Sequence, residues 1–217
     1  MTDTIAQTIS FVKGQSLSEG SHDWWHVYRV WQLSKKLAEN EGADLFVTQL
    51  AALLHDIGDW KFHGGDETIG PAMARNWLMQ QGVDAPTMEH VCQIIAGVSF
   101  KGAGVQTEMP TKEGKCVQDA DRLDALGAIG IARCFAYGGS KGRPIYDPNI
   151  PPEQHNSFAA YQKNAGPSLN HFYEKLLLLK DRMQTESGRT MAEERHAFMV
   201  RYLEQFMAEC NPQLKSA

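Results

Sequence analysis

Hydrophobic residues recur at intervals of three and four along most of the chain, and this is the spacing of amphipathic helices. No run alternates hydrophobic and polar residues for long enough to predict a strand. The sequence therefore predicts an all-α fold, a helical bundle. The predicted helices are a short one closed by Gly14, one from Ser21 or Asp23 to Gly42, one from Asp44 to Gly58, and others over 71–81, 88–98, 115–137 with a break near Gly127, 169–183 and 191–207.

The segment that begins at Asp44 is hydrophobic on nearly every side. A helix of that kind is stable only when it is surrounded by other elements, so we expect it in the middle of the core. Between the helices, glycine, proline and polar residues predict loops over 58–67, 99–112 and 138–152.

The composition is that of an ordinary globular chain. Its 217 residues are 42% hydrophobic and 22% charged, enough for one sizeable core. We expect a single domain over 1–217, with a core over 21–137. The C-terminal helices, over 168–210, either complete the bundle or form a homodimer contact.

Charge and hydropathy exclude several classes of protein. A net charge of −5 argues against a protein that binds duplex nucleic acid through broad phosphate neutralisation. The longest hydrophobic stretches, such as Leu176 to Leu179, are far shorter than the roughly 20 residues that cross a membrane. The N-terminus has neither the basic flank nor the hydrophobic segment of a secretory signal, which favours a cytoplasmic location.

Cysteines and tryptophans are expected in the core. Cysteine pairs of the CxxC type are missing from the sequence, so we expect reduced core thiols rather than a disulfide framework or a zinc–thiolate site. The four cysteines are Cys92, Cys116, Cys134 and Cys210. The tryptophans that we expect to anchor the core are Trp24, Trp25 and Trp31.

Titratable residues interrupt three of the predicted hydrophobic helices. His26 lies on the helix that begins near Ser21, and His55 and Asp56 end the most hydrophobic helix. Asp121 and Asp124 lie between Val117 and Leu126 on a third. Burying a charge among leucines costs several kcal/mol unless an opposite charge compensates it, as a divalent cation would.

Imidazole and carboxylate groups from separate helices can converge on one ion. Such mixed donors suit one divalent Mn, Fe, Co, Ni or Mg ion better than a thiolate-seeking metal. Four protein ligands leave water positions open, and hydrolysis needs an open position because the metal lowers the pKa of the water that it binds.

The order of these motifs resembles the HD-domain superfamily of metal-dependent phosphohydrolases. The matching segments are His26 to Val30, Leu53 to Asp59 and Asp119 to Asp124, and the string from His55 to His63 resembles the small stand-alone bacterial branch, one member of which is a deoxynucleoside triphosphate pyrophosphohydrolase. The resemblance implies that the metal ligands are His26, His55, Asp56 and Asp121. It also implies a helical HD-type bundle and a nucleotide or other small phosphorylated substrate.

Two departures limit this resemblance. Asp59 and Trp60 stand where the guanosine-tetraphosphate hydrolases of the superfamily have a Glu-Asp pair, which argues against that substrate. A second His-Asp pair, His22-Asp23, lies at a helix start, where Asp23 would meet the positive end of the helix dipole. We therefore predict that this pair begins a helix and supplies no ligand.

Three residues near the end of the apolar helix are candidates for catalysis and substrate binding. Asp59 either acts with Asp56 as a catalytic group that orients or deprotonates the attacking water, or caps a turn. Lys61 and His63 either contact substrate phosphates or belong to a solvated loop.

Other charged residues have two alternatives each. Arg29 either clamps a phosphate or forms an internal ion pair with Asp121 or Asp124, and the ion pair is favoured. Asp124 is expected to support the ligands rather than to bind the ion, and His90 is expected either to lie in the core or to support the ligands. Arg133 and Lys141 either bind an anionic substrate or are surface charges.

These features predict a metal-dependent phosphohydrolase that attacks a phosphoester or phosphoanhydride through a metal-bound water. The alternative is a ligand-binding or regulatory HD module whose metal site is structural or inactive.

Overall fold

The computed structural model describes residues 2–15, 23–58, 66–100, 104–105, 107–153 and 166–210. Every regular element within these ranges is a helix, so the prediction of an all-helical fold is confirmed there. No helix in the described part of the chain is both long enough and hydrophobic enough to cross a membrane.

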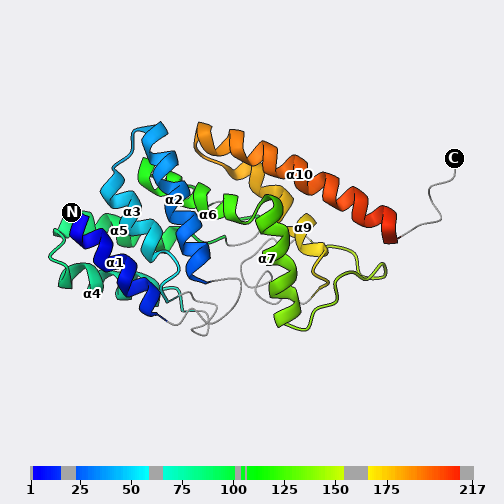
Figure 1. Ribbon diagram of the computed structural model, residues 1–217, viewed down its shortest axis with the longest axis horizontal. Coiled ribbons are helices and arrows are strands. Elements are labelled where there is room, and N and C mark those ends of the chain that lie inside the picture. The colour runs from blue at the N-terminus through cyan, green and yellow to red at the C-terminus, as the bar shows by residue number, and fades with distance from the viewer. Residues whose placement is uncertain are drawn as a thin grey trace.

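Three helices form the centre of the molecule: α2 (Trp24–Glu41), α3 (Leu45–Leu54) and α6 (Lys112–Asp124). Both α3 and α6 pack against α2, and they also contact each other (Figure 1). As expected, α3 is buried along most of its length. Asp23 and Asp44 cap the starts of α2 and α3 by accepting hydrogen bonds from backbone N–H groups, and Gly42 ends α2 in the left-handed conformation.

Three further helices cover one end of this centre. The first helix, α1 (Thr2–Gly14), packs on α3, and so does α5 (Ala85–Gly97). Between them in the sequence lies α4 (Ile69–Gln80), which packs on α5. The ring of Phe11 stacks on the ring of Trp77 at a centroid distance of 4.0 Å, which joins α1 to α4.

The C-terminal half packs on the other end. The chain turns between α6 and α7 (Gly127–Ser140), where Gly127 has φ +71°, so the predicted break near Gly127 is confirmed. The last helix, α10 (Glu186–Cys210), packs on α7 and also contacts α6 and α2. In Figure 1 it runs from the middle of the upper edge toward the right-hand end of the molecule.

The predicted helix over 169–183 is wrong as a single element. The structure has a short α9 (Asn170–Glu174), a break at Lys175 and then a 3₁₀ helix, η2 (Leu176–Arg182). The two buried leucines of η2, Leu176 and Leu179, are three residues apart. A 3₁₀ helix aligns residues at that spacing on one face, so it buries both of them at once.

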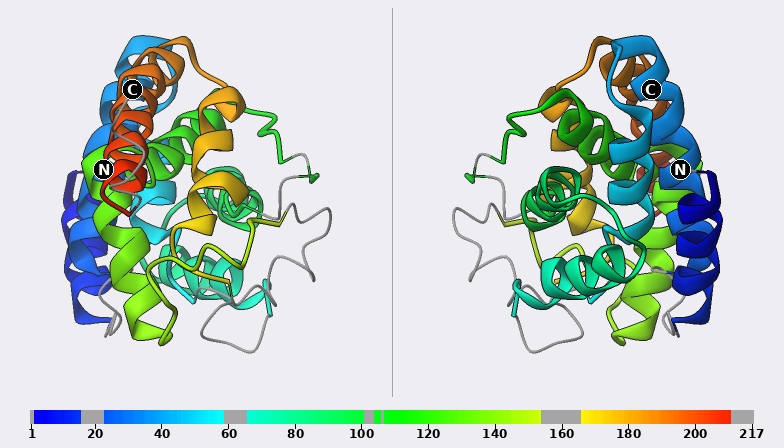
Figure 2. Two further views of the ribbon diagram at one scale, coloured as in Figure 1. Left: turned by 90° about the vertical axis from the view of Figure 1, so that its right-hand side faces the viewer. Right: turned by 90° about the vertical axis from the view of Figure 1, so that its left-hand side faces the viewer.

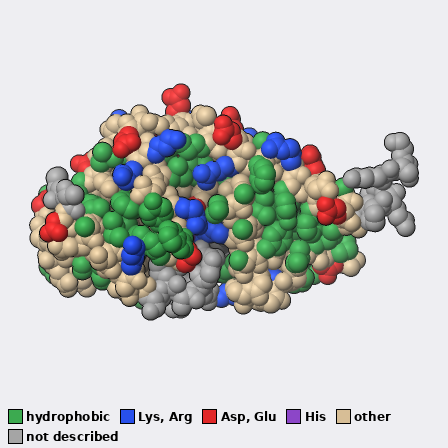
Figure 3. All heavy atoms as spheres, in the orientation of Figure 1, with side chains coloured by type: hydrophobic (Ala, Val, Ile, Leu, Met, Phe, Trp, Pro, Cys, Tyr) green, Lys and Arg blue, Asp and Glu red, His purple; other side chains and the backbone are tan. Residues whose placement is uncertain are grey.

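Two other expectations about the core are corrected. Trp25 is 61% exposed, because it lies on the outer face of α2, and Cys210 is exposed at the end of α10. The other three cysteines are buried free thiols, and burial raises the pKa of Cys116 and of Cys134 to about 12. On the face shown in Figure 3, hydrophobic side chains gather over α1 and α2 and separately over α7.

Candidate metal centre

His26 is fixed at the start of α2. The side chain of Asp23 accepts a hydrogen bond from the backbone N–H of His26 at 2.9 Å, which sets the first turn of the helix. Because this face of α2 packs against α3 and α6, the imidazole is only 1% exposed. The expectation that Asp23 begins a helix is confirmed, and His22 lies outside the described residues.

His55 and Asp56 follow directly after the end of α3. The ring of His55 donates a hydrogen bond from Nδ1 to the carbonyl oxygen of Ala52, one turn earlier, at 2.8 Å. Two residues later the chain reverses at Gly58, where φ is +67°. A Cβ atom there would lie 2.9 Å from Cγ2 of Ile69, so both the conformation and the space require glycine. This turn presents both side chains at the end of the hydrophobic helix.

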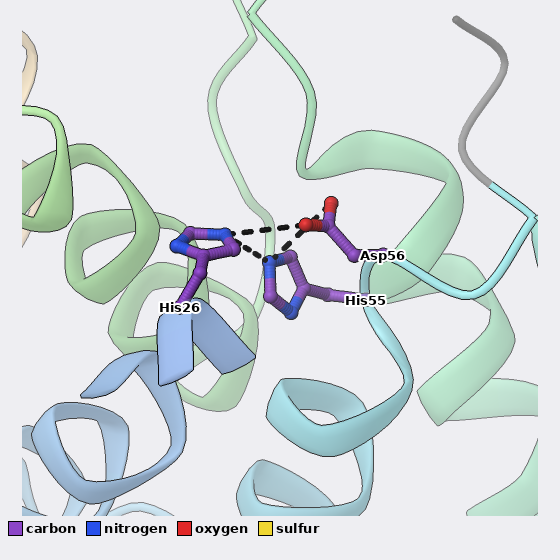
Figure 4. A group of neighbouring side chains, drawn as sticks. All are labelled: His26, His55 and Asp56. Atoms are coloured by element: carbon purple, nitrogen blue, oxygen red, sulfur yellow. Dashed lines mark hydrogen bonds and ion pairs between the residues drawn. The ribbon is translucent and has the colours of Figure 1, made fainter. Parts of the chain in front are cut away.

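The two histidines and Asp56 converge on one point (Figure 4). Nε2 of His26 lies 3.2 Å from Nε2 of His55 and 3.2 Å from Oδ2 of Asp56. Nε2 of His55 lies 3.5 Å from Oδ1 of Asp56. His26 comes from the start of α2, and His55 and Asp56 come from the turn that follows α3, which packs against α2.

Asp121 approaches the same point from α6. Its Oδ1 lies 3.5 Å from Nε2 of His26 and 3.8 Å from Nε2 of His55. At 30% its side chain is the most exposed of the four. The structure therefore brings together the four side chains that the sequence predicts as ligands.

Asp124 supports His26 from the side away from this point. It accepts a hydrogen bond from Nδ1 of His26 at 2.7 Å, and the guanidinium of Arg29 donates to both of its oxygens. Arg133 donates a further bond to Oδ2 at 2.8 Å. Burial alone would raise the pKa of Asp124, but the bonds from His26 and Arg29 hold that pKa well below its usual range.

These contacts fix the protons of both rings. Each Nδ1 faces an acceptor, a carboxylate for His26 and a carbonyl for His55, so each Nδ1 carries the hydrogen. On a neutral ring Nε2 then carries the lone pair, and the two Nε2 atoms lie 3.2 Å apart. Such an arrangement is repulsive unless a proton or a cation lies between them.

The charge at this point favours a cation. Burial by itself lowers the pKa of His26, but hydrogen bonds to Asp124 and Asp56 outweigh it, and the pKa is raised above its usual value. Ligand atoms about 2.1 Å from one ion lie about 3.0 Å apart at right angles and about 3.4 Å apart at tetrahedral corners. The distances among His26, His55 and Asp56 are close to these values, so the cluster could hold a metal ion.

The structure places the predicted substrate residues unevenly. Asp59, Lys61 and His63 lie outside the described residues. Arg29 and Arg133 both form ion pairs with Asp124, so Arg29 has the internal pair that the sequence favours. Their distance in sequence from Asp124, 95 residues for Arg29 and nine for Arg133, explains why sequence alone leaves the partner of each open.

Two candidates lie apart from the cluster. His90 is bonded through Nε2 to the hydroxyl of Thr111, which caps the opposite end of α6 from Asp121 and Asp124. No contact connects it to the ligands within the described residues, so the structure does not support the assisting role expected of it. Lys141 is exposed after α7, with its ammonium 5.5 Å from the ring of Tyr137.

The HD domain family matches residues 24–126, the range that contains all four converging side chains. The Bacillus subtilis protein YpgQ is 40% identical over 187 residues, which cover 85% of this chain and 82% of YpgQ. The chain belongs to the HD domain family.

Solved structures agree with this assignment over almost the whole HD protein. A Bacillus thuringiensis HD-superfamily hydrolase is 46% identical with a TM-score of 0.75, and 98% of this chain and 99% of that one are covered. A Lactobacillus plantarum protein is 34% identical with a TM-score of 0.86 and the same coverage. The structure of YpgQ in complex with ADP is 36% identical with a TM-score of 0.74, and covers 97% of this chain and 100% of YpgQ.

Proposed function

We propose that this HD protein is a metal-dependent phosphohydrolase that cleaves a phosphoanhydride or phosphoester bond of a small phosphorylated substrate, in particular a nucleotide. The observation that carries the proposal is the convergence of the two Nε2 atoms, 3.2 Å apart, with the carboxylates of Asp56 and Asp121. The nucleotide class is supported by the structure of YpgQ with ADP, a relative with the same fold. Within that class, (deoxy)nucleoside triphosphate pyrophosphohydrolysis is the activity that we would test first.

His26, His55, Asp56 and Asp121 are the side chains that would hold one divalent ion. When bound, such an ion lowers the pKa of a water ligand and polarises a phosphoryl oxygen. The protein fixes the orientation of both imidazoles through Asp124 and the carbonyl of Ala52, which keeps each Nε2 available as a ligand. The more exposed Asp121 marks the side from which we expect water and substrate to arrive.

The proton transfer needs a further group near this point. We propose Asp59, because it follows Asp56 by three residues, with Lys61 and His63 as phosphate contacts. Arg29 and Arg133 are held by Asp124, so we propose that they position His26 and add positive charge near the substrate, rather than forming a phosphate clamp of their own.

The test combines metal analysis with turnover. The full-length protein, purified without added metal, is analysed for bound transition metals and then assayed with manganese on nucleoside triphosphates, nucleoside diphosphates and cyclic nucleotides. We expect turnover of at least one class, and a loss of about a hundredfold or more in Asp56→Ala. Asp3→Ala, an exposed carboxylate on α1, is the matched control and should retain full activity.

Two outcomes would contradict the proposal. Full activity in Asp56→Ala would show that this cluster is not the catalytic centre. Stoichiometric metal without turnover of any substrate in the panel would favour a regulatory HD module with a structural metal site.

A further inference from the structure

A pocket lies against the face of α6 that carries Lys115 and Arg122. Lys115, Asp119 and Arg122 recur at intervals of four and three, so they share one face of the helix. Asp124 follows Arg122 by two residues, and at 100° per residue this places it about 200° around the helix axis. The face that carries Lys115 and Arg122 therefore points away from Asp124 and from the ring of His26 that Asp124 holds.

This pocket has a volume of about 630 Å³. It lies between α6, the described residues of the preceding loop at 104–105 and 107–109, and the corner where η2 leads into α10. This part of the loop is joined to η2 by a hydrogen bond from Arg182 to the carbonyl of Val105, and Figure 2 shows it beside η2. The volume is in the range of small-molecule sites. The lining residues that matter for its chemistry are Thr107, Lys115, Arg122, Arg182, Gln184 and Arg189.

The lining has an excess of positive charge. It contains four basic residues, Lys115, Arg122, Arg182 and Arg189, and two acidic ones, Glu108 and Asp181. Both acidic side chains point to solvent, and Asp181 is 78% exposed and paired with Lys180, which does not line the pocket.

Arg122 is the buried cation of this pocket. It is only 6% exposed, and its guanidinium donates to the carbonyl of Arg182 and to the hydroxyl of Thr107. Its Nε has no hydrogen-bond partner among the described residues. Burial lowers the pKa of Arg122 to about 10. Asp119 on the same face of α6 and the neighbouring Asp121 offset part of the cost of burying this charge, and an anion in the pocket would reduce that cost further.

The charged groups nearer the mouth have no carboxylate bonded to them within the described residues. Arg189 donates to the backbone carbonyls of Met183 and Gln184, which are neutral. Lys115 makes no side-chain hydrogen bond or ion pair within the described part of the chain. Guanidinium and ammonium groups arranged in this way match the oxygens of phosphate groups.

We propose that this pocket binds the phosphate groups of a small phosphorylated ligand, at a site separate from the metal centre. Recognition comes from Arg122 at the buried end and from Lys115 and Arg189 nearer solvent. Asp124 lies on the opposite face of α6, and Asp121 lies about 100° around the helix axis from Arg122, so the two sites share one helix but not one face. This inference does not depend on the proposed hydrolase activity.

Calorimetric titration of the full-length, manganese-loaded protein with inorganic phosphate, pyrophosphate, ADP and adenosine tests the proposal. The pocket variant is Lys115→Gln with Arg189→Gln. Its matched control is Lys112→Gln with Arg201→Gln, which removes the same charges from exposed positions on the same two helices. Both pairs are on the surface side of their helices, and thermal unfolding checks that each variant is folded.

We expect a pyrophosphate-binding event that persists in Asp56→Asn, weakens about tenfold or more in the pocket variant and changes less than about twofold in the control. ADP binding with no adenosine binding would show recognition through phosphate alone. If inorganic phosphate binds as tightly as pyrophosphate, the free ion is the ligand.

Two results would overturn the proposal. One is binding that disappears entirely in Asp56→Asn and is unchanged in the pocket variant, which would leave the metal centre as the only phosphate site and the proposed function intact. The other is equal weakening in the pocket variant and its control, which would show a general effect of surface charge.

Discussion

Asp119 and Asp124 lie on the same helix, both are almost fully buried, and yet different kinds of group hold them. Asp124 is surrounded by the imidazole of His26 and the guanidinium groups of Arg29 and Arg133. Asp119 accepts bonds from the backbone N–H groups of Gln184 and Thr185 and from the hydroxyl of Thr185. One carboxylate therefore has charged partners and the other has neutral ones.

The pKa directions follow from these partners. Burial raises the pKa of Asp119, and its hydrogen bonds offset only part of that effect. For Asp124 the bonds from His26 and Arg29 outweigh burial and lower the pKa. The comparison shows that one helix serves two purposes: Asp124 orients a side chain of the candidate metal centre, and Asp119 ties α6 to the start of α10.

The largest expected effect is that of Asp124→Asn. This change leaves three basic groups around a neutral side chain, so we expect the free energy of unfolding to fall by about 3–5 kcal/mol. It also releases the ring of His26, so metal affinity should fall by about 10–100-fold. Urea unfolding of the metal-free protein and metal titration measure the two effects.

Asp181→Asn, at an exposed position, is the control for Asp124→Asn and should change neither quantity. Unchanged stability and metal affinity in Asp124→Asn would mean that this ion-pair network does not support the site.

Asp119→Asn should have a smaller effect of a different kind. The amide oxygen still accepts from one N–H group, but its NH₂ group faces other donors, so we expect a loss of about 1–3 kcal/mol in unfolding free energy. Metal affinity should stay within about twofold of the original protein, because Asp119 touches none of the four converging side chains. A fall in metal affinity like that of Asp124→Asn would show that the two faces of α6 are coupled.

The sequence predicts those features that depend on nearby residues. Helix periodicity and the capping residues Asp23, Asp44 and Gly42 correctly predict the starts of α2 and α3 and the end of α2, whereas α3 ends at Leu54 and not at the predicted Gly58. The position of His55 and Asp56 at the end of a hydrophobic helix predicts that they enter the core, because the location of such a helix follows from its composition. The addition of His26 and Asp121 to these two residues follows from the resemblance to the HD superfamily rather than from helix composition.

Features that depend on distant contacts were not predictable in the same way. Asp119 and Asp124 look alike in sequence, and only the packing of α10 and α2 against opposite sides of α6 gives them different partners. Arg122 gives no sequence signal for burial, because arginine is usually exposed. The break at Lys175 is also set by tertiary packing, since four consecutive leucines are compatible with both an α-helix and a 3₁₀ helix.

The smallest expected effect concerns Gly188, in the first turns of α10. A Cβ atom there would lie 2.6 Å from Oδ2 of Asp119 and 2.6 Å from the hydroxyl of Thr185, and it would separate the two groups that join α6 to α10.

Replacing a helical glycine by alanine normally stabilises a protein by about 0.5–1 kcal/mol. Gly139→Ala, on the exposed face of α7 with open space around it, should show that gain. Gly188→Ala should instead lower the unfolding free energy by about 1 kcal/mol, because the steric conflict outweighs the gain in helix propensity. Urea unfolding of both variants decides the sign, and stabilisation of both would mean that the contact between Asp119 and Thr185 adjusts without cost.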